Sequence, residues 1–500
     1  MSALARALLA QLARRRLAEL GRQDVRTTQE RLLRALLARA QATRFGRAHG
    51  FSAIRTVADF RARVPLRDYD AMWRAYWEPA FPRLEGVSWP GPIRFFALSS
   101  GTTTGVTKYL PVSDAMVRAN QQAALDILVF HHSRRPQTRL MDGRIFMLGG
   151  SVAMRELAPG IRAGDLSGIA QATAPWWIQA HRFPTGALAA ISDWEEKIAV
   201  LGPASRTADI RAVTGLPSWL VRFVERQGVM RLVELWPRLE LVIHGGVGFA
   251  PYRARFEALL EGSRAETREV FPASEGFFAI ADRGDGEGLR LLVDRGVFIE
   301  LVPVEELGAA EPRRLTIDQA ETGVDYALAV TTCAGLWAYL VGDVVRFVTT
   351  RPPRVIVAGR TAWSLSAFGE HLVQAEIEAA LAEAGAASGV TVSDYCVAAI
   401  VPARAGERGR HRWLVELEGP PPEAGALAAV LDAALARRNA DYAKHRAFSG
   451  GIDTPELVIL PRGGFERWMA ARGKLGGQHK VPRVLADPAQ LDAIRQAALG

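Results

Sequence analysis

The hydrophobic positions along the chain follow two periods, which divide it into regions. Leucines at positions 4, 8 and 12, and again at 32, 33, 36 and 37, recur at helical spacing, which predicts two helices within residues 3–45. Residues 50–90 read as helical and loop segments that end in the turn signal WPGP. From residue 91 to about 350, short apolar runs such as RIFMLGG, LELVIHGG and DYALAVTT alternate with helical segments such as PSWLVRFVERQ. That alternation is typical of an α/β or mixed sheet domain.

After residue 352 the pattern restarts on a smaller scale. EHLVQAEIEAALAEA and AGALAAVLDAALARR have the helical period, whereas YCVAAIVPA, HRWLVELEG and ELVIL read as strands. A chain of 500 residues has room for more than one domain. We therefore predict an α/β (mixed α+β) protein with a large domain over residues 1–352 and a small α+β domain over residues 353–500.

Composition and charge narrow the class of protein. Apolar residues make up 49% of the chain and no apolar run approaches the roughly 18 residues of a membrane span, so a globular protein without a membrane partner is predicted. The net charge is +9, but the arginines are interspersed with acids, which does not indicate a nucleic-acid partner. The two cysteines, Cys333 and Cys396, suggest neither a disulfide framework nor a metal site, which favours a reducing, cytoplasmic compartment.

The chemistry-bearing candidate is the stretch FFALSSGTTTGVTKYLPVS, residues 95–113, in which an apolar run leads into seven consecutive Ser, Thr and Gly residues. Gly101 and Gly105 allow the backbone to wrap around an anion, and the hydroxyls are hydrogen-bond donors. Lys108 adds a compact positive charge, in a chain where only five of 62 basic residues are lysine. The spacing differs from the Walker pattern. The alternative is a polar turn between two strands.

This loop resembles the phosphate-binding signature of adenylate-forming enzymes and, within them, that of the Gretchen Hagen family of acyl-acid amido synthetases. Three further stretches resemble the family's motifs in the expected order: FPASEGFF (271–278), YLVGDVVRF (339–347) and GRTAWSLSAFGEHLVQAEIE (359–378). The tail KLGGQHKVPR is similar to the family's C-terminal lysine loop. The resemblance covers most of the chain and implies the adenylate-forming fold, a large N-terminal domain followed by a smaller mobile C-terminal one.

The resemblance implies ATP and Mg²⁺ as cofactors and assigns roles to residues. The residues that would hold the β- and γ-phosphates are Ser99, Ser100, Gly101, Thr102, Thr103, Gly105 and Lys108. Glu275 would coordinate Mg²⁺, because that cation prefers carboxylate and phosphate oxygens. Ser274 would contact the α-phosphate and Phe271 would stack on the adenine. The remaining nucleotide contacts would come from Asp343 to the ribose, Arg360 to the ribose or phosphate, and Gly246 to the adenine edge.

A mobile lysine from the small domain completes the expected catalytic set of Lys480, Lys108 and Glu275. Lys480 follows the flexible GGQH, and Lys474 is the alternative. Two departures from the pattern stand out: Phe271 replaces the family's usual tyrosine, and Trp363 and Ser366 occupy hinge positions where many superfamily members have Asp and Lys.

Structural explanations remain open for these residues. Glu275 could be a surface acid at a strand end, Asp343 a turn aspartate, Gly246 a turn glycine, and either lysine a surface group. The tryptophans of APWWIQAHRF could line an acyl pocket, but core packing is the favoured interpretation.

The predicted function is ATP-dependent adenylation of a carboxylic acid followed by acyl transfer to an amine, expected to be an amino acid. The partners are then small-molecule acids and amino acids. Two alternatives remain: transfer of the acyl group to coenzyme A, or a nucleotide-binding module without catalysis.

Overall fold

A computed structural model describes residues 3–99, 107–149, 153–191, 194–246, 249, 252–284, 286–360, 364–365, 367–370, 372–402, 404, 407–447, 451–471, 481–485 and 487–499. The described residues form two compact units. The first comprises residues 3–99, 107–249 and 257–360, and the second comprises residues 252–256 and the described residues from Ser364 on. The expected limit after residue 352 lies in the turn between two paired strands, β15 and β16.

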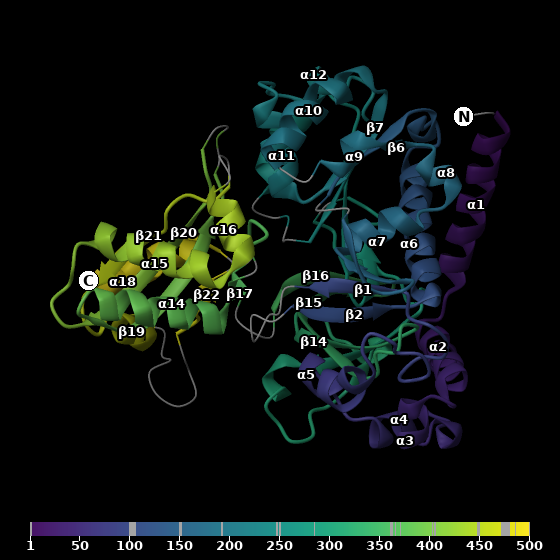
Figure 1. The fold of residues 1–500 in the computed structure, drawn as a ribbon, viewed down its shortest axis with the longest axis horizontal. Coiled ribbons are helices and arrows are strands. Elements are labelled where there is room, and N and C mark those ends of the chain that lie inside the picture. The colour runs from purple at the N-terminus through teal and green to yellow at the C-terminus, as the bar shows by residue number, and fades with distance from the viewer. Residues whose placement is uncertain are drawn as a thin grey trace. The chain divides into compact units, whose positions relative to one another are not determined.

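The first unit contains, in its described part, a twelve-stranded sheet and a four-stranded sheet (Figure 1). The order of the large sheet is β13 (Leu315–Thr316), β12 (Val297–Pro303), β14 (Asp325–Thr332), β15 (Tyr339–Thr350), β16 (Pro353–Arg360), β11 (Leu289–Leu291), β10 (Gly276–Ile280), β9 (Glu266–Ala273), β8 (Leu241–Gly245), β7 (Ile210–Gly215), β3 (Arg144–Leu148) and β6 (Arg182–Phe183). The small sheet has the order β2 (Lys108–Val112), β1 (Phe95–Ser99), β5 (Ile161–Gly164) and β4 (Met154–Ala158).

The large sheet combines two kinds of pairing. Strands β9, β8, β7, β3 and β6 run parallel to one another, whereas the strands from β13 to β10 pair antiparallel. Every residue of β12 is buried, as is nearly every residue of β14, which matches their continuous apolar sequence.

The helices up to residue 260 follow local sequence signals. Helix α2 (Val25–Ala40) begins where Asp24 accepts a hydrogen bond from the Thr27 amide, and it buries Leu33, Leu36 and Leu37. Helix α1 lies along α6 (Figure 1). The other helices are α1 (Ala3–Arg22), α3 (Arg44–Ala48), α4 (Val57–Arg63), α5 (Tyr69–Met72), α6 (Asp114–Arg134), α7 (Leu166–Thr173), α8 (Trp176–Gln179), α9 (Ala187–Ala190), α10 (Trp194–Thr207), α11 (Pro217–Arg226), α12 (Leu232–Leu235) and α13 (Arg253–Leu260). The short helical turns are η1 (Phe51–Ala53), η2 (Trp73–Trp77), η3 (Glu78–Ala80), η4 (Leu140–Asp142), η6 (Val304–Glu306) and η7 (Ile317–Gln319).

The second unit has its own sheet and its own core. Its strands have the order β21 (Glu456–Leu460), β20 (Arg410–Glu418), β19 (Thr391–Ile400) and β22 (Val484–Leu485), with a separate pair β17 (Ser364–Leu365) and β18 (Leu372–Val373). Its helices are α14 (Gln374–Ala387), α15 (Ala424–Arg438), α16 (Ala440–Ala447), α17 (Gly464–Ala471) and α18 (Ala489–Leu499). The mixture of sheets and helices confirms the predicted α/β fold class.

Candidate active site

The predicted phosphate loop connects strands β1 and β2, which pair so that Ser99 lies opposite Lys108. The predicted residues Ser100, Gly101, Thr102, Thr103 and Gly105 lie outside the described residues. The structure corrects the ends of the loop, because Ser99 and Lys108 belong to strands and not to the loop itself. Both side chains are therefore positioned by a hydrogen-bonded hairpin.

Lys108 has a half-buried side chain whose Nζ lies 5.4 Å from the centroid of the Tyr69 ring. Burial lowers the pKa of Lys108, and the charge of Glu275 offsets part of that effect. Asp68 and Asp70 act in the same direction as Glu275. The lysine is thus a partly desolvated cation in an acidic neighbourhood.

Glu275 lies in the two-residue turn between β9 and β10, and yet it is only 9% exposed. Burial raises the pKa of Glu275 to about 7, and the charge of Asp343 raises it further, against the opposing effects of Lys108 and Arg360. The interpretation of Glu275 as a surface acid is therefore wrong. A buried carboxylate that faces a second carboxylate is a suitable group for a divalent cation.

Asp343 and Arg360 lie opposite each other in the antiparallel pair β15–β16. Nε of Arg360 is 3.5 Å from Oδ1 of Asp343, and their side chains are 28% and 16% exposed. Asp343 lies inside β15, so the alternative that it is a turn aspartate is wrong. Arg360 ends β16 and orients the carboxylate from the neighbouring strand.

Gly246, Phe271 and Ser274 lie at the carboxyl edge of the parallel strands. Gly245 pairs with Val270, so Gly246 follows β8 at the level of Phe271 in β9. Gly246 is exposed and has a φ of +84°, and a Cβ there would lie 2.7 Å from Leu216 Cδ2. Only glycine fits these two conditions without strain. Ligands of open parallel sheets bind at such carboxyl edges.

Phe271 is more enclosed than the sequence suggests. It is 8% exposed and meets Phe278 edge-on at a centroid distance of 5.1 Å and an interplanar angle of 74°. Ser274, the residue before Glu275 in the turn, is half-buried. Adenine stacking by Phe271 and a phosphate contact by Ser274 stay predictions.

Two tyrosines that the sequence analysis missed lie beside this cluster. Tyr339 is 1% exposed, and burial followed by the charge of Glu275 raises its pKa well above the ordinary value. The Tyr69 hydroxyl accepts a hydrogen bond of 2.9 Å from the Tyr109 amide, next to Lys108. Tyr339 begins the YLVGD motif, which was a usable signal, whereas nothing in the sequence around Tyr69 connects it to Lys108.

The cluster of Lys108, Glu275, Asp343 and Arg360 therefore comes from two hairpins and one turn that are far apart in sequence. Within the described ranges no three His, Cys, Asp or Glu side chains converge as a metal-ligand group.

Two groups of predicted residues fall elsewhere. Lys474 and Lys480, together with Trp363 and Ser366, lie outside the described residues. In helix α8, Trp177 packs against the core around Ile127 and Leu241, which agrees with the core-packing interpretation. Trp176 does not agree with it, because its side chain is 81% exposed. In the described part of the chain, no helix combines the length and apolarity that crossing a bilayer requires.

Comparison with protein families gives three matches in chain order. The GH3 family N-terminal domain matches residues 15–150, the central domain matches residues 290–360, and the C-terminal domain matches residues 373–489. The order and extent agree with the sequence motifs that indicated the Gretchen Hagen (GH3) family.

Individual relatives agree with this assignment. The chain is 24% identical to the probable indole-3-acetic acid-amido synthetase GH3.2 of Oryza sativa subsp. japonica, over 92% of this chain and 88% of that protein. It is 29% identical to the GH3 domain-containing protein of Homo sapiens, over 48% of this chain and 46% of that protein.

Solved structures confirm the fold. AtGH3.15 acyl acid amido synthetase in complex with 2,4-DB matches with a TM-score of 0.61 and 17% identity, covering 99% of this chain and 96% of that one. A 2-hydroxyisobutyryl-CoA ligase in complex with 2-HIB-AMP and CoA matches with a TM-score of 0.53 and 18% identity, covering 92% and 91%. Motifs, domain matches and fold agree, and the chain belongs to the GH3 family.

Proposed function

We propose that this protein is a ligase that adenylates a carboxylic acid with ATP and then transfers the acyl group to an amine, an amino acid in our proposal, to form an amide. The observation that carries the proposal is the convergence of Lys108, Glu275, Asp343 and Arg360 at one place in the first unit. The similarity to plant relatives named as indole-3-acetic acid-amido synthetases supports the same chemistry.

In the first step a carboxylate oxygen attacks the α-phosphorus of ATP, and the bond to the β-phosphate breaks, so that pyrophosphate leaves. Negative charge increases on the phosphate oxygens in the transition state, and stabilising it requires cations and N–H or O–H donors. Lys108 would interact with the β- and γ-phosphates from the start of β2. Glu275 would hold Mg²⁺, which would supply positive charge to the phosphates when bound.

The nucleoside would be fixed by the other two members of the cluster. An ionised Asp343 accepts hydrogen bonds from both ribose hydroxyls, and Arg360 keeps that carboxylate oriented. Gly246 would let the backbone approach the adenine edge, with Phe271 against its face. Ser274 and the glycine-rich loop would donate to the phosphates.

In the second step the amine nitrogen attacks the acyl carbon, the bond to the AMP oxygen breaks, and the amine loses a proton. We propose that the small C-terminal domain carries Lys480 for the first step and turns before the second. The runner-up is transfer to coenzyme A, for which the fold match to the CoA ligase is the supporting observation. Cys333 and Cys396 are buried free thiols, which suits our proposal of a cytoplasmic location.

The deciding experiment is a screen of carboxylic acids by ATP–pyrophosphate exchange, followed by mass spectrometry of products formed with the twenty amino acids and with coenzyme A. We expect acid-dependent exchange and an amide product. A thioester product would replace the second half of the proposal, and the absence of exchange with every acid would contradict the first half.

A further inference from the structure

Tyr69, the first residue of α5, has its side chain next to the start of strand β2. Nζ of Lys108 lies over the Tyr69 ring, 5.4 Å from the ring centroid. The Tyr69 hydroxyl accepts a hydrogen bond of 2.9 Å from the amide of Tyr109, which is 40 positions further along the chain. One side chain therefore contacts both the ammonium group of Lys108 and the backbone of the residue that follows it.

The hydrogen bond to Tyr109 is made at the edge of the small sheet. Among the described strands of that sheet, β2 is at one end of the order β2–β1–β5–β4. The outward N–H groups of an edge strand have no neighbouring strand as acceptor. The Tyr69 hydroxyl is the acceptor for one of them, and it thereby fixes the backbone of β2 close to Lys108.

The Tyr69 ring restricts the side chain of Lys108. A lysine ammonium group is carried on a flexible four-carbon stem. An aromatic face attracts such a cation within about 6 Å of the ring centroid, and more strongly where water is partly excluded. Tyr69 is 6% exposed and Lys108 is half-buried. The cation–π contact therefore limits the conformations of Lys108 before any nucleotide is bound.

Tyr69 is itself held firmly in place. Trp73 stacks on its ring with the centroids 5.6 Å apart, and Trp77 meets the ring edge-on at 6.0 Å. Asp68 caps α5 by accepting a hydrogen bond of 2.8 Å from the Ala71 amide. Burial raises the pKa of Tyr69 to about 12, so its hydroxyl stays neutral at physiological pH. A fixed, uncharged ring is suited to orienting a neighbouring cation.

We propose that Tyr69 is a positioning residue, which holds the ammonium group of Lys108 and the start of β2 in the arrangement that receives the phosphates of ATP. This role rests on the proposed adenylation, in which Lys108 interacts with the β- and γ-phosphates. Tyr69 acts through Lys108 and not on the substrate, so its effect should vanish when Lys108 is absent.

A double-mutant cycle in the pyrophosphate-exchange reaction tests this dependence. Tyr69→Leu removes the ring and the hydroxyl, and it should lower kcat/KM for ATP by about threefold to thirtyfold through the lost cation–π contact. In the Lys108→Ala background the same substitution should change kcat/KM by less than about twofold. Equal fold-losses in the two backgrounds would overturn the proposal, because Tyr69 would then act independently of Lys108.

A more conservative variant guards against misfolding of the leucine variant. Tyr69→Phe keeps the ring and loses the hydroxyl, so kcat/KM should fall by about twofold to tenfold. The matched control is Tyr326→Phe, because Tyr326 is 2% exposed and its hydroxyl also accepts a backbone hydrogen bond, of 3.1 Å from the Glu321 amide. That control should keep kcat/KM within about twofold, and thermal unfolding verifies the fold of each variant. Equal losses in the two phenylalanine variants would overturn the positioning role.

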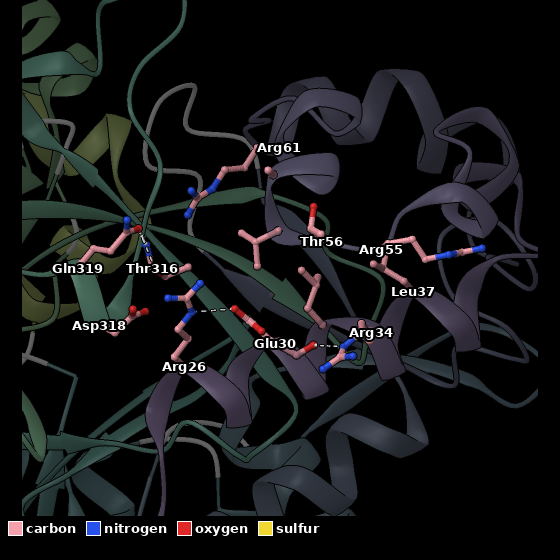
Figure 2. Close-up of a pocket in the computed structure, with 13 residues that line it drawn as sticks. Arg26, Glu30, Arg34, Leu37, Arg55, Thr56, Arg61, Thr316, Asp318 and Gln319 are labelled. Carbon is pink, nitrogen blue, oxygen red and sulfur yellow. Dashed lines mark hydrogen bonds and ion pairs between the residues drawn. The ribbon is translucent and has the colours of Figure 1, made fainter.

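A second control comes from a cavity of about 440 Å³ that residues of α2, α4 and the β13–η7 segment line (Figure 2). Arg34 is an exposed residue of its wall, and the lining residues include neither Tyr69 nor Lys108. Arg34→Gln should therefore keep kcat/KM within about twofold. A loss as large as that of Tyr69→Leu would overturn the assignment of the Tyr69 effect to Lys108.

A spectroscopic test does not depend on the proposed function. The chain has five lysines, so reductive methylation with ¹³C-formaldehyde gives few lysine signals in NMR spectra, and Lys108→Arg identifies the Lys108 signal by its loss. We expect the Tyr69 ring to shift this signal upfield, in Tyr69→Phe as in the native protein, and the shift to disappear in Tyr69→Leu.

The two kinds of measurement separate the two proposals. If the Lys108 signal had the same position in Tyr69→Leu as in the native protein, Tyr69 would not hold Lys108 and the positioning role would be overturned. A native protein that showed the shift but no pyrophosphate exchange would contradict the proposed adenylation, and it would still support Tyr69 as the group that holds Lys108.

Discussion

Asp343 and Arg360 lie directly opposite each other across strands β15 and β16, with Nε of Arg360 3.5 Å from Oδ1 of Asp343. The ladder holds the two residues at this register, so the carboxylate is oriented before any nucleotide arrives. The charge of Asp343 also contributes to the raised pKa of Glu275. One ion pair therefore connects the proposed ribose site to the proposed metal site.

Replacing Asp343 with asparagine tests that connection. Asp343→Asn keeps the shape but weakens a charge-assisted hydrogen bond of roughly 1.5–3 kcal/mol, so kcat/KM for ATP should fall by about tenfold to a hundredfold. The apparent pKa of Glu275 should also fall, because a like charge is removed. Pyrophosphate exchange at varied ATP concentration and pH measures both effects.

The control for that substitution is Asp325→Asn on the neighbouring strand β14, where Asp325 pairs with Arg346 at a largely exposed position. It should leave the exchange rate close to that of the native protein. If Asp343→Asn changed thermal stability alone, the ribose contact would be excluded.

Lys108→Ala should slow adenylation strongly without unfolding the protein. The side chain is half-buried and burial lowers its pKa, so the ammonium group is not required for folding. Its positive charge acts where the phosphates are expected. Exchange rate and thermal unfolding should be measured together, with Lys444→Ala, an exposed lysine of α16, as the control. An unchanged exchange rate would remove Lys108 and its hairpin from the mechanism.

Glu275 should impose a pH dependence on catalysis. Its pKa of about 7 means that the carboxylate becomes protonated as the pH falls through neutrality, which opposes Mg²⁺ binding. We expect kcat/KM to fall on the acid side with an apparent pKa near 7 at low Mg²⁺, and this limb should move to lower pH as Mg²⁺ is raised. If the pH at which kcat/KM falls on the acid side did not depend on the Mg²⁺ concentration, Glu275 would not be the metal ligand.

The raised pKa of Glu275 should also make the stability of the protein depend on pH. The pKa of Glu275 is about 7 in the folded protein against an ordinary value of 4.5, so the folded state binds more protons than the unfolded state between these pH values. The free energy of unfolding therefore falls as the pH rises through this window, by about 3 kcal/mol. Glu275→Gln should remove that dependence, so its stability relative to the native protein should be greater at pH 8 than at pH 4. Urea unfolding measures the free energy of unfolding of both proteins at pH 4 and at pH 8. If the difference between the variant and the native protein were the same at both pH values, the prediction would be wrong.

Lys480 is proposed to act only when the small domain closes. Its charge would act mainly in the adenylation transition state, so Lys480→Ala should lower kcat more than ATP affinity. The variant should still convert chemically synthesised acyl-adenylate into the amide. Lys474→Ala is the matched comparison from the same tail. If Lys474→Ala showed this behaviour instead, the assignment would move to Lys474, and if neither variant slowed adenylation, the small domain would supply no essential lysine.

Arg16 should stabilise the fold without serving catalysis. This residue of α1 is 5% exposed and donates to Asp126 and Asp294, which lie 110 and 278 residues further along the chain. Arg16→Met removes the charge-assisted hydrogen bonds to Asp294 and one of the two arginines that bind Asp126, which Arg295 still contacts, so the free energy of unfolding should fall by about 1.5–3 kcal/mol. Arg231→Met, at an exposed pair with Glu234, should cost less than about 1 kcal/mol. Equal effects on urea unfolding would show that the Arg16 network contributes nothing.

Local patterns in the sequence determined the elements and the family. The periodicity predicted α15 and β21 with their observed bounds, Ala424–Arg438 and Glu456–Leu460. Each element packs one apolar face against a single core, and that face leaves a periodic pattern in its own sequence. The motifs identified Lys108, Glu275, Asp343 and Arg360, because those side chains occur in short stretches with recognisable spacing.

The environment of these side chains was decided by tertiary structure alone. Glu275 follows a strand in a tight turn, a position that reads as exposed, and its burial beside Asp343 and Tyr339 depends on strands far apart in the sequence. The same holds for Tyr69 beside Lys108 and for the two aspartates that Arg16 bridges. Periodicity and motifs report interactions between residues that are close in the sequence. The desolvation and the pKa of a side chain depend instead on every charged group and every apolar side chain that the fold brings within a few ångströms of it.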